Sequence, residues 1–162
     1  MLIILEGADG SGKTTLRQKF ADMGYITKAC VPHEQIDWQE IWNAADTLDI
    51  VLDRSWISDA VYRTVQRDVK PWDAPLQQVI NLFDSNTVIV YCKTKTQYKD
   101  SMLRGEDNIT DVGMAKKIST FYDDFLHFIS VFTDAKVIKF DWQNDTFNEL
   151  LMNIKGVRNN AV

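Results

Sequence analysis

The sequence contains little cysteine and no long hydrophobic run. Its two cysteines, Cys30 and Cys92, fall in apolar stretches, and no metal-ligand spacing surrounds them. We therefore expect buried, reduced thiols in a cytoplasmic protein rather than a disulfide framework or a zinc site. No segment is apolar over the length that a transmembrane helix needs, and the chain starts with an apolar strand pattern instead of a basic leader. We expect neither a membrane span nor a signal peptide.

The sequence also lacks an excess of positive charge. It carries 18 lysines and arginines against 23 aspartates and glutamates, which gives a net charge of −5. Such a charge repels polyanions, so we expect no long nucleic-acid footprint, whereas a local basic pocket for a small nucleotide is compatible with it. Internal repeats, low-complexity tracts and linker-like segments are absent as well. We therefore expect residues 1–162 to form a single domain.

One glycine-rich segment stands out in this sequence. Residues 7–14 read Gly-Ala-Asp-Gly-Ser-Gly-Lys-Thr, the spacing of a phosphate-binding P-loop. The apolar run 1–5 before it predicts a buried parallel strand, and residues 15–23 after it predict a helix that Gly24 ends. The segment thus lies between a strand and a helix, which is the setting that this motif requires. The alternative, a glycine-rich turn that matches the spacing by chance, would not explain why a strand precedes the segment and a helix follows it.

Each residue type in this segment suits a nucleoside triphosphate. Glycines let backbone N–H groups point at phosphate oxygens, and the helix N-terminus adds partial positive charge. Lys13 can neutralise the β- and γ-phosphates, and the Thr14 hydroxyl can bind Mg²⁺. We predict ATP and Mg²⁺ as ligands. The ATP contacts expected from this segment are Gly7, Asp9, Gly10, Ser11, Gly12, Lys13, Thr14 and Thr15.

Strands and helices are predicted to alternate along the rest of the chain. Apolar runs predict four further strands, at residues 25–31, 49–52, 87–92 and 136–140. Amphipathic spacing and capping residues predict helices at about 36–45, 55–67, 73–83, 94–104, 111–129 and 146–154. This alternation is typical of an α/β fold with right-handed crossovers, here a five-stranded parallel sheet flanked by helices on both faces.

Two motifs that other P-loop proteins use are missing. The chain has no Asn-Lys-x-Asp element for guanine recognition, and no Asp-x-x-Gly follows the third strand. Instead, Asp53 and Arg54 stand at the end of that strand, where ligands bind in open α/β sheets. An arginine there can hold an acceptor in line with the γ-phosphate of ATP. Because the chain is also too short for motor subdomains, the pattern favours a small-molecule kinase.

At these residues the chain resembles the thymidylate kinase family of nucleoside monophosphate kinases. The resemblance covers most of the chain and begins with residues 3–15, including the carboxylate of Asp9 inside the P-loop. In that family this carboxylate lies near the acceptor's sugar and the metal. The resemblance implies a P-loop kinase fold and phosphoryl transfer from ATP to a deoxynucleoside monophosphate. The catalytic residues that it implies are Lys13, Arg54, Arg104 and Asp9.

The third strand and the following helix carry a second part of this resemblance. Asp53-Arg54, Ser58 and Tyr62 are similar to the family's Asp-Arg-x-x-x-Ser-x-x-Ala-Tyr signature. By that match Arg54 binds the acceptor's 5′-phosphate, Asp53 acts on the Mg²⁺ shell together with Thr14, and Tyr62 lies under the sugar. Ser58 and the neighbouring Arg63 are expected to belong to the acceptor site as well.

Two loops resemble further parts of this family. Residues 103–107 resemble its lid, which we expect at residues 104–109. Arg104 would supply positive charge in the transition state, because the P-loop itself contains no arginine. Residues 140–144 resemble the loop that packs on the adenine of ATP, which assigns Trp142 and Gln143 to the ATP site.

The nucleobase is open at this stage. Asp59 holds the base-reading position of its helix, and a carboxylate fits a base edge that presents N–H groups, such as thymine or, better, guanine. The alternative is a local interaction of Asp59 within the helix. Trp38 and Trp42 lie on an aromatic face that serves either core packing or base stacking. The segments that shape the family's base pocket and dimer surface are short here, so a homodimer is also open.

A second resemblance competes with the first. Residues 53–59 are also similar to the Glu-Arg-Ser-x-x-Ser-Asp motif of deoxynucleoside kinases, which phosphorylate a nucleoside 5′-hydroxyl. Those enzymes need a general base, and Val31 stands where their glutamate would be. Val31 and Asp9 therefore favour the monophosphate kinase, whereas Glu34 keeps the alternative open. A non-catalytic nucleotide-binding protein and a kinase acting on modified bases in DNA are the remaining hypotheses.

Overall fold

The computed structural model describes residues 1–31, 35–67, 83–93 and 112–159. Strands and helices alternate along these segments, as the sequence predicts. Their bounds are β1 Leu2–Glu6, α1 Lys13–Asp22, β2 Ile26–Ala29, α2 Trp38–Ala45, β3 Ile50–Asp53, α3 Trp56–Arg67, β4 Thr87–Cys92, α6 Val112–Phe132, β5 Lys136–Phe140 and α7 Phe147–Asn159. The helices predicted at 73–83 and 94–104 lie outside the described residues, apart from Phe83.

The strands β4 and β5 have the predicted bounds, whereas other elements differ at their ends. Helix α1 begins at Lys13 rather than at residue 15, because the backbone N–H of Leu16 donates to the carbonyl of Gly12 at 3.0 Å and starts the helix inside the P-loop. Strand β3 includes Asp53, which is in register with Leu5 of β1. Lys13 and Thr14 therefore belong to a helix and Asp53 to a strand, and rigid elements position all three.

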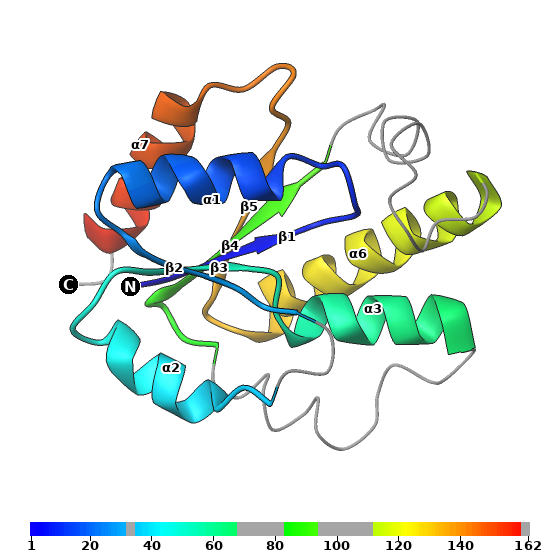
Figure 1. Ribbon diagram of the computed structural model, residues 1–162, viewed down its shortest axis with the longest axis horizontal. Helices are drawn as coiled ribbons and strands as arrows, with labels where there is room; N and C mark the ends of the chain where they lie inside the picture. The colour runs from blue at the N-terminus through cyan, green and yellow to red at the C-terminus, as the bar shows by residue number, and fades with distance from the viewer. Residues whose placement is uncertain (32–34, 68–82, 94–111, 160–162) are drawn as a thin grey trace.

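The five strands form one parallel sheet in the order β2-β3-β1-β4-β5. Figure 1 shows α1 and α7 on one face of this sheet and α2, α3 and α6 on the other. The prediction of a five-stranded parallel sheet with helices on both faces is thus confirmed. In this order β1 lies between β3 and β4, at the point where the strand order reverses. Open α/β sheets bind ligands at the carboxyl edge beside such a point.

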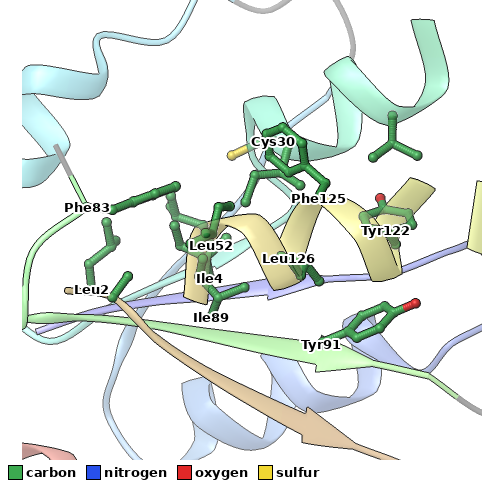
Figure 2. Close-up of a cluster of buried hydrophobic side chains, with 14 of the residues drawn as sticks. Leu2, Ile4, Cys30, Leu52, Phe83, Ile89, Tyr91, Tyr122, Phe125 and Leu126 are labelled. Carbon is green, nitrogen blue, oxygen red and sulfur yellow. The ribbon is translucent and has the colours of Figure 1, made fainter. Parts of the chain in front are cut away.

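Alternate residues of the strands build two separate hydrophobic cores. Leu2 and Ile4 of β1 pack with Tyr122 and Leu126 of α6 in the first core, which also contains residues of α2 and α3. Figure 2 shows part of this core, with Tyr91 and Tyr122 at one end and Leu2 and Phe83 at the other. The residues between them, such as Ile3, face the second core, which contains side chains of α1 and α7. Because successive side chains of a strand point to opposite faces of the sheet, a polar residue at the end of a strand points to the same face as the residues two and four positions before it.

Both cysteines are buried reduced thiols, as predicted: Cys30 follows β2 and Cys92 ends β4. Among the described helices, none has the length and hydrophobicity needed to traverse a bilayer.

Candidate nucleotide-binding site

The P-loop connects β1 to α1 at the carboxyl edge of the sheet, and its turn depends on glycine. Gly7, Gly10 and Gly12 all have positive φ angles, of 140°, 75° and 87°. A Cβ atom on Gly7 would stand 2.2 Å from the carbonyl oxygen of Cys92, and one on Gly12 would stand 3.0 Å from Cδ1 of Trp142. Only glycine allows β4 and the Trp142 loop to approach the P-loop this closely.

Lys13 lies within the concave side of the P-loop. Its buried ammonium group donates to the carbonyl oxygens of Gly7 and Ala8, both at 2.8 Å, and to Oγ of Ser11 at 3.2 Å. Burial, followed by the positive charge of Arg54, lowers the pKa of Lys13 to about 8. A bound polyphosphate would restore favourable interactions to this desolvated cation, so the geometry suits an anion at the loop.

Thr14 and Asp53 form a hydroxyl–carboxylate pair next to the P-loop. Oγ1 of Thr14 donates to Oδ2 of Asp53 at 3.0 Å, and Nε of Arg17 lies 3.9 Å from the same oxygen. Asp53 points toward α1 because it lies two residues after Val51 in β3, and Val51 faces the second core. Mg²⁺ prefers hard oxygen ligands and one or two carboxylates, so this pair fits the metal that the sequence predicts.

Arg54 is the centre of a second cluster on the opposite side of the strand end. It has a φ of 77°, unusual for a residue with a side chain. Its guanidinium group forms an ion pair with Asp9 of the P-loop and lies 5.4 Å from the ring centroid of Tyr62. The Tyr62 hydroxyl donates to the other oxygen of Asp9 at 2.9 Å. The structure thus brings together three residues that the sequence assigns to catalysis or to the acceptor.

The charge of Arg54 is well stabilised despite its burial. Burial by itself lowers the pKa of the guanidinium group, but the neighbouring Tyr122, Asp9, Tyr62 and Glu6 outweigh it and raise the pKa overall. Burial and the adjacent Asp9 likewise raise the pKa of Tyr62, so its hydroxyl keeps its proton and serves as a donor. The cluster is therefore a fixed cation with one neutral donor beside it, which suits recognition of an anion attached to a sugar.

A cavity of about 1060 Å³ joins the P-loop, the Thr14–Asp53 pair and Arg54, whereas Tyr62 is not among the described residues that line it. Its walls come from the P-loop, the start of α1, the end of β3 and the segment before α7, including Asp9, Lys13, Asp53, Arg54 and Trp142. Thr15 and the remaining P-loop residues 10–14 line it as well. Trp142 is half exposed and lies over Gly12, beside the predicted triphosphate site. The neighbouring Gln143 is exposed, and its backbone N–H donates to Asp141 at 3.1 Å.

The other predicted acceptor residues do not line this cavity. Asp59 and Arg63 form an exposed ion pair with each other along α3, at 2.9 Å. Trp42 is buried in the first core against Phe83, and the half-buried Trp38 packs on its edge. Their roles in base recognition stay predictions. Arg104, the lid at 104–109 and Glu34 lie outside the described residues.

Sequence reasoning missed Glu6, the last residue of β1. It is completely buried on the side of the first core, in line with Leu2 and Ile4. Ser55 donates to one of its carboxylate oxygens at 2.5 Å and Ser58 to the other at 2.6 Å. A carboxylate at the end of a fully apolar strand, directly before the P-loop, was the signal that could have identified it.

No family model and no curated sequence matches the chain, whereas several solved structures do. The YorR protein of Bacillus subtilis, solved with phosphorylated GDP, is 19% identical and has a TM-score of 0.70 over 98% of this chain and 96% of its own. Deoxyadenosine kinase from M. mycoides is 18% identical and has a TM-score of 0.65 over 100% of both chains. Thymidylate kinase from Ehrlichia chaffeensis is 14% identical and has a TM-score of 0.55 over 98% of both.

The chain has the fold of the P-loop nucleoside and nucleotide kinases. This likeness extends over nearly its whole length, and it includes both families that the sequence resembles. Deoxyadenosine kinase has also been solved with bound dATP and with bound dCTP. The P-loop, the Thr14–Asp53 pair and the Arg54 cluster lie at the carboxyl edge of the sheet, where a P-loop kinase fold presents its ligands.

Proposed function

We propose that this protein transfers the γ-phosphoryl group of ATP to the 5′-phosphate of a deoxynucleoside monophosphate. The observation that supports this best is that Arg54 lies in the wall of the same cavity as the P-loop cation Lys13. Lys13 is held by the backbone of the P-loop, whereas Arg54 is held by the Asp9 side chain. A protein that only binds ATP has a use for Lys13 but none for Arg54, so Arg54 points to a second, anionic substrate.

The reaction needs positioning and charge neutralisation more than proton transfer. An oxygen of the acceptor phosphate attacks the γ-phosphorus, a new P–O bond forms, and the bond to the β–γ bridging oxygen breaks as ADP leaves with its electron pair. Lys13 binds the donor phosphates, and Arg54 holds the acceptor phosphate. Asp9 and Tyr62 orient the sugar. Because the attacking phosphate is already anionic, no general base is required.

Magnesium belongs to this proposal as the expected cofactor. Thr14 would bind it directly and Asp53 through water. Bound Mg²⁺ would offset the negative charge of the donor phosphates. Trp142 and Gln143 are proposed at the adenine, and Arg104 as a further cation at the transferred group. Ser58, Asp59, Arg63, Trp38 and Trp42 stay proposals for the acceptor side, as do a homodimer and a cytoplasmic location.

The test is an ADP-release assay with ATP·Mg²⁺ against a panel of deoxynucleoside monophosphates and the matching nucleosides. We expect turnover with at least one monophosphate, and loss of that turnover in Arg54→Ala. Lys136→Ala, at the amino end of β5 and therefore at the opposite edge of the sheet, is the matched control and should keep full activity. ATP hydrolysis that no acceptor stimulates would contradict the proposal and favour a nucleotide-binding protein without a second substrate.

A deoxynucleoside kinase is the second candidate. It is supported by the higher TM-score of the deoxyadenosine kinase, 0.65 against 0.55 for the thymidylate kinase. In that case the acceptor is a 5′-hydroxyl, and a carboxylate must take its proton. Asp9, which faces the cavity beside Arg54, and Glu34 are the residues to substitute. Turnover with nucleosides and none with monophosphates would establish this candidate over the first.

A further inference from the structure

Glu6 forms a buried network that the proposed reaction does not explain. It accepts hydrogen bonds from Ser55 at 2.5 Å and from Ser58 at 2.6 Å, and the Tyr122 hydroxyl lies 3.4 Å from the same oxygen that Ser58 contacts. Hydroxyl–oxygen distances this short are typical of hydrogen bonds to an ionised carboxylate. Burial raises the pKa of Glu6, while the two serine bonds and the nearby Arg54 and Lys13 act against that rise.

The network continues to Arg54 through a single atom, Oγ of Ser58. Nη1 of Arg54 donates to this oxygen at 3.3 Å, and the Tyr122 hydroxyl lies 2.8 Å from it. A serine hydroxyl has one proton and two lone pairs. Ser58 donates its proton to Glu6 at 2.6 Å, so the lone pairs of Ser58 are left facing Arg54 and Tyr122.

We propose that Glu6 is a positioning residue for the acceptor site: through Ser58 it fixes the guanidinium group of Arg54. The inference rests on the proposed function insofar as Arg54 binds the acceptor. Arg54 is thereby held from two sides, by Asp9 on the cavity side and by Ser58 on the buried side. With both contacts in place, the guanidinium plane has one orientation, and its remaining N–H groups are available to an anionic substrate.

The variant Ser55→Ala distinguishes the positioning of Arg54 by Glu6 from a purely structural role of Glu6. Ser55 contacts the other oxygen of Glu6, and its Oγ accepts from the backbone N–H of Ile57 at 3.1 Å, so it joins Glu6 to the start of α3. If Glu6 only anchored α3 to β1, Glu6→Gln would leave Arg54 as Ser55→Ala leaves it, and only Ser58→Ala, which removes a direct contact of Arg54, would disturb it. If Glu6 acts through Ser58, only the changes at Glu6 and Ser58 reach Arg54.

The first experiment measures Arg54 directly and needs no substrate. In ¹⁵N-edited spectra, the Nε–Hε signal of Arg54 is assigned by its loss in Arg54→Lys. We expect this signal to shift and broaden in Glu6→Gln and in Ser58→Ala, and to stay in place in Ser55→Ala. Glu6→Gln conserves shape but replaces an acceptor-only group by one that also donates, so Ser58 can no longer be oriented as before. An unchanged Arg54 signal in Glu6→Gln would overturn the proposal, whatever the substrate proves to be.

The second experiment uses the acceptor that the panel identifies. We expect Glu6→Gln and Ser58→Ala each to raise the KM of the acceptor about tenfold, as for the loss of one hydrogen bond to a charged group, with the KM of ATP within about twofold. The double variant should be no worse than Ser58→Ala, because both changes break one chain of contacts. If the KM values of ATP and of the acceptor rose equally, or if the effects of the two substitutions were additive in the double variant, the proposal that Glu6 acts through Ser58 would be overturned. If Glu6→Gln does not fold, Glu6→Asp, which keeps the charge but shortens the side chain away from Ser58, takes its place in both experiments.

Discussion

We expect the desolvated ammonium group of Lys13 to make the proposed nucleotide binding sensitive to pH. Its pKa of about 8 lies well below the ordinary lysine value of 10.5. A bound polyphosphate favours the charged form, so the pKa rises on binding and the complex takes up a proton. Near pH 8, where the free group is half protonated, we expect an uptake of about half a proton per ATP, and weaker binding as the pH rises further. Calorimetric titration in two buffers of different ionisation enthalpy measures this uptake.

Lys13→Met provides the control for that titration. The variant should bind ATP weakly and without any dependence of the enthalpy on the buffer. Proton release, or an uptake that persists in Lys13→Met, would show that another group titrates.

Tyr62 contributes a ring and a hydroxyl, and the two can be separated. Tyr62→Phe keeps the ring beside Arg54 but removes the donor to Asp9 at 2.9 Å. The loss of one hydrogen bond predicts a rise of about three- to tenfold in the KM of the acceptor, with little change for ATP. Steady-state kinetics with each substrate varied measures both constants. Tyr25→Phe, whose ring packs on Phe20 in the second core, is the matched control and should leave both KM values unchanged.

At the scale of the element, the P-loop depends on Gly12. An alanine there would have to adopt a φ of 87° and place its Cβ 3.0 Å from Cδ1 of Trp142. The left-handed backbone alone costs about 1–2 kcal/mol, and relief of that cost would turn the backbone N–H groups away from the phosphates. We expect Gly12→Ala to raise the KM of ATP at least about tenfold. Adding Trp142→Ala removes the crowding but not the dihedral cost, so it should not restore ATP binding; full recovery would show that crowding was the whole effect.

The elements of the sheet could be predicted from the sequence because their signals are local. Strand β4 is an almost continuous apolar run and β5 mixes apolar residues with two lysines, and the bounds of both agree with prediction. An end that depends on a turn differs from the prediction: α1 begins two residues early, since the bond from Leu16 to Gly12 forms only once the P-loop has its glycine geometry. The hydrogen-bond partners of Glu6 could not be predicted, because Ser58 and Tyr122 lie on two different helices that only the fold brings to the end of β1.

At the scale of the whole molecule, the cavity joins segments that are far apart in the chain. Lys13, Asp53 and Trp142 come from α1, β3 and the loop after β5. A ligand that contacts all three binds the folded state alone, and at one hundred times its Kd it stabilises that state by about 2.7 kcal/mol. For a chain of this size we expect ATP·Mg²⁺ to raise the Tm by about 5–10 °C in a thermal shift assay. Mg²⁺ alone should have little effect, and an unchanged Tm at concentrations that saturate turnover would contradict a shared site.

The sequence by itself determined the alternation of strands and helices, the P-loop with Lys13 and Thr14, and the position of Asp53 and Arg54 at the end of a strand. These follow from periodicity and from spacing within one segment, which depend on neighbours in the chain. Only the tertiary structure decided that β1 lies between β3 and β4, that Asp9 and Tyr62 meet at Arg54, and that Ser55 and Ser58 reach Glu6. The physical reason is that a polar side chain is defined by its partner, and here the partners of Glu6, Asp9 and Asp53 are brought to them by parallel pairing of strands distant in sequence.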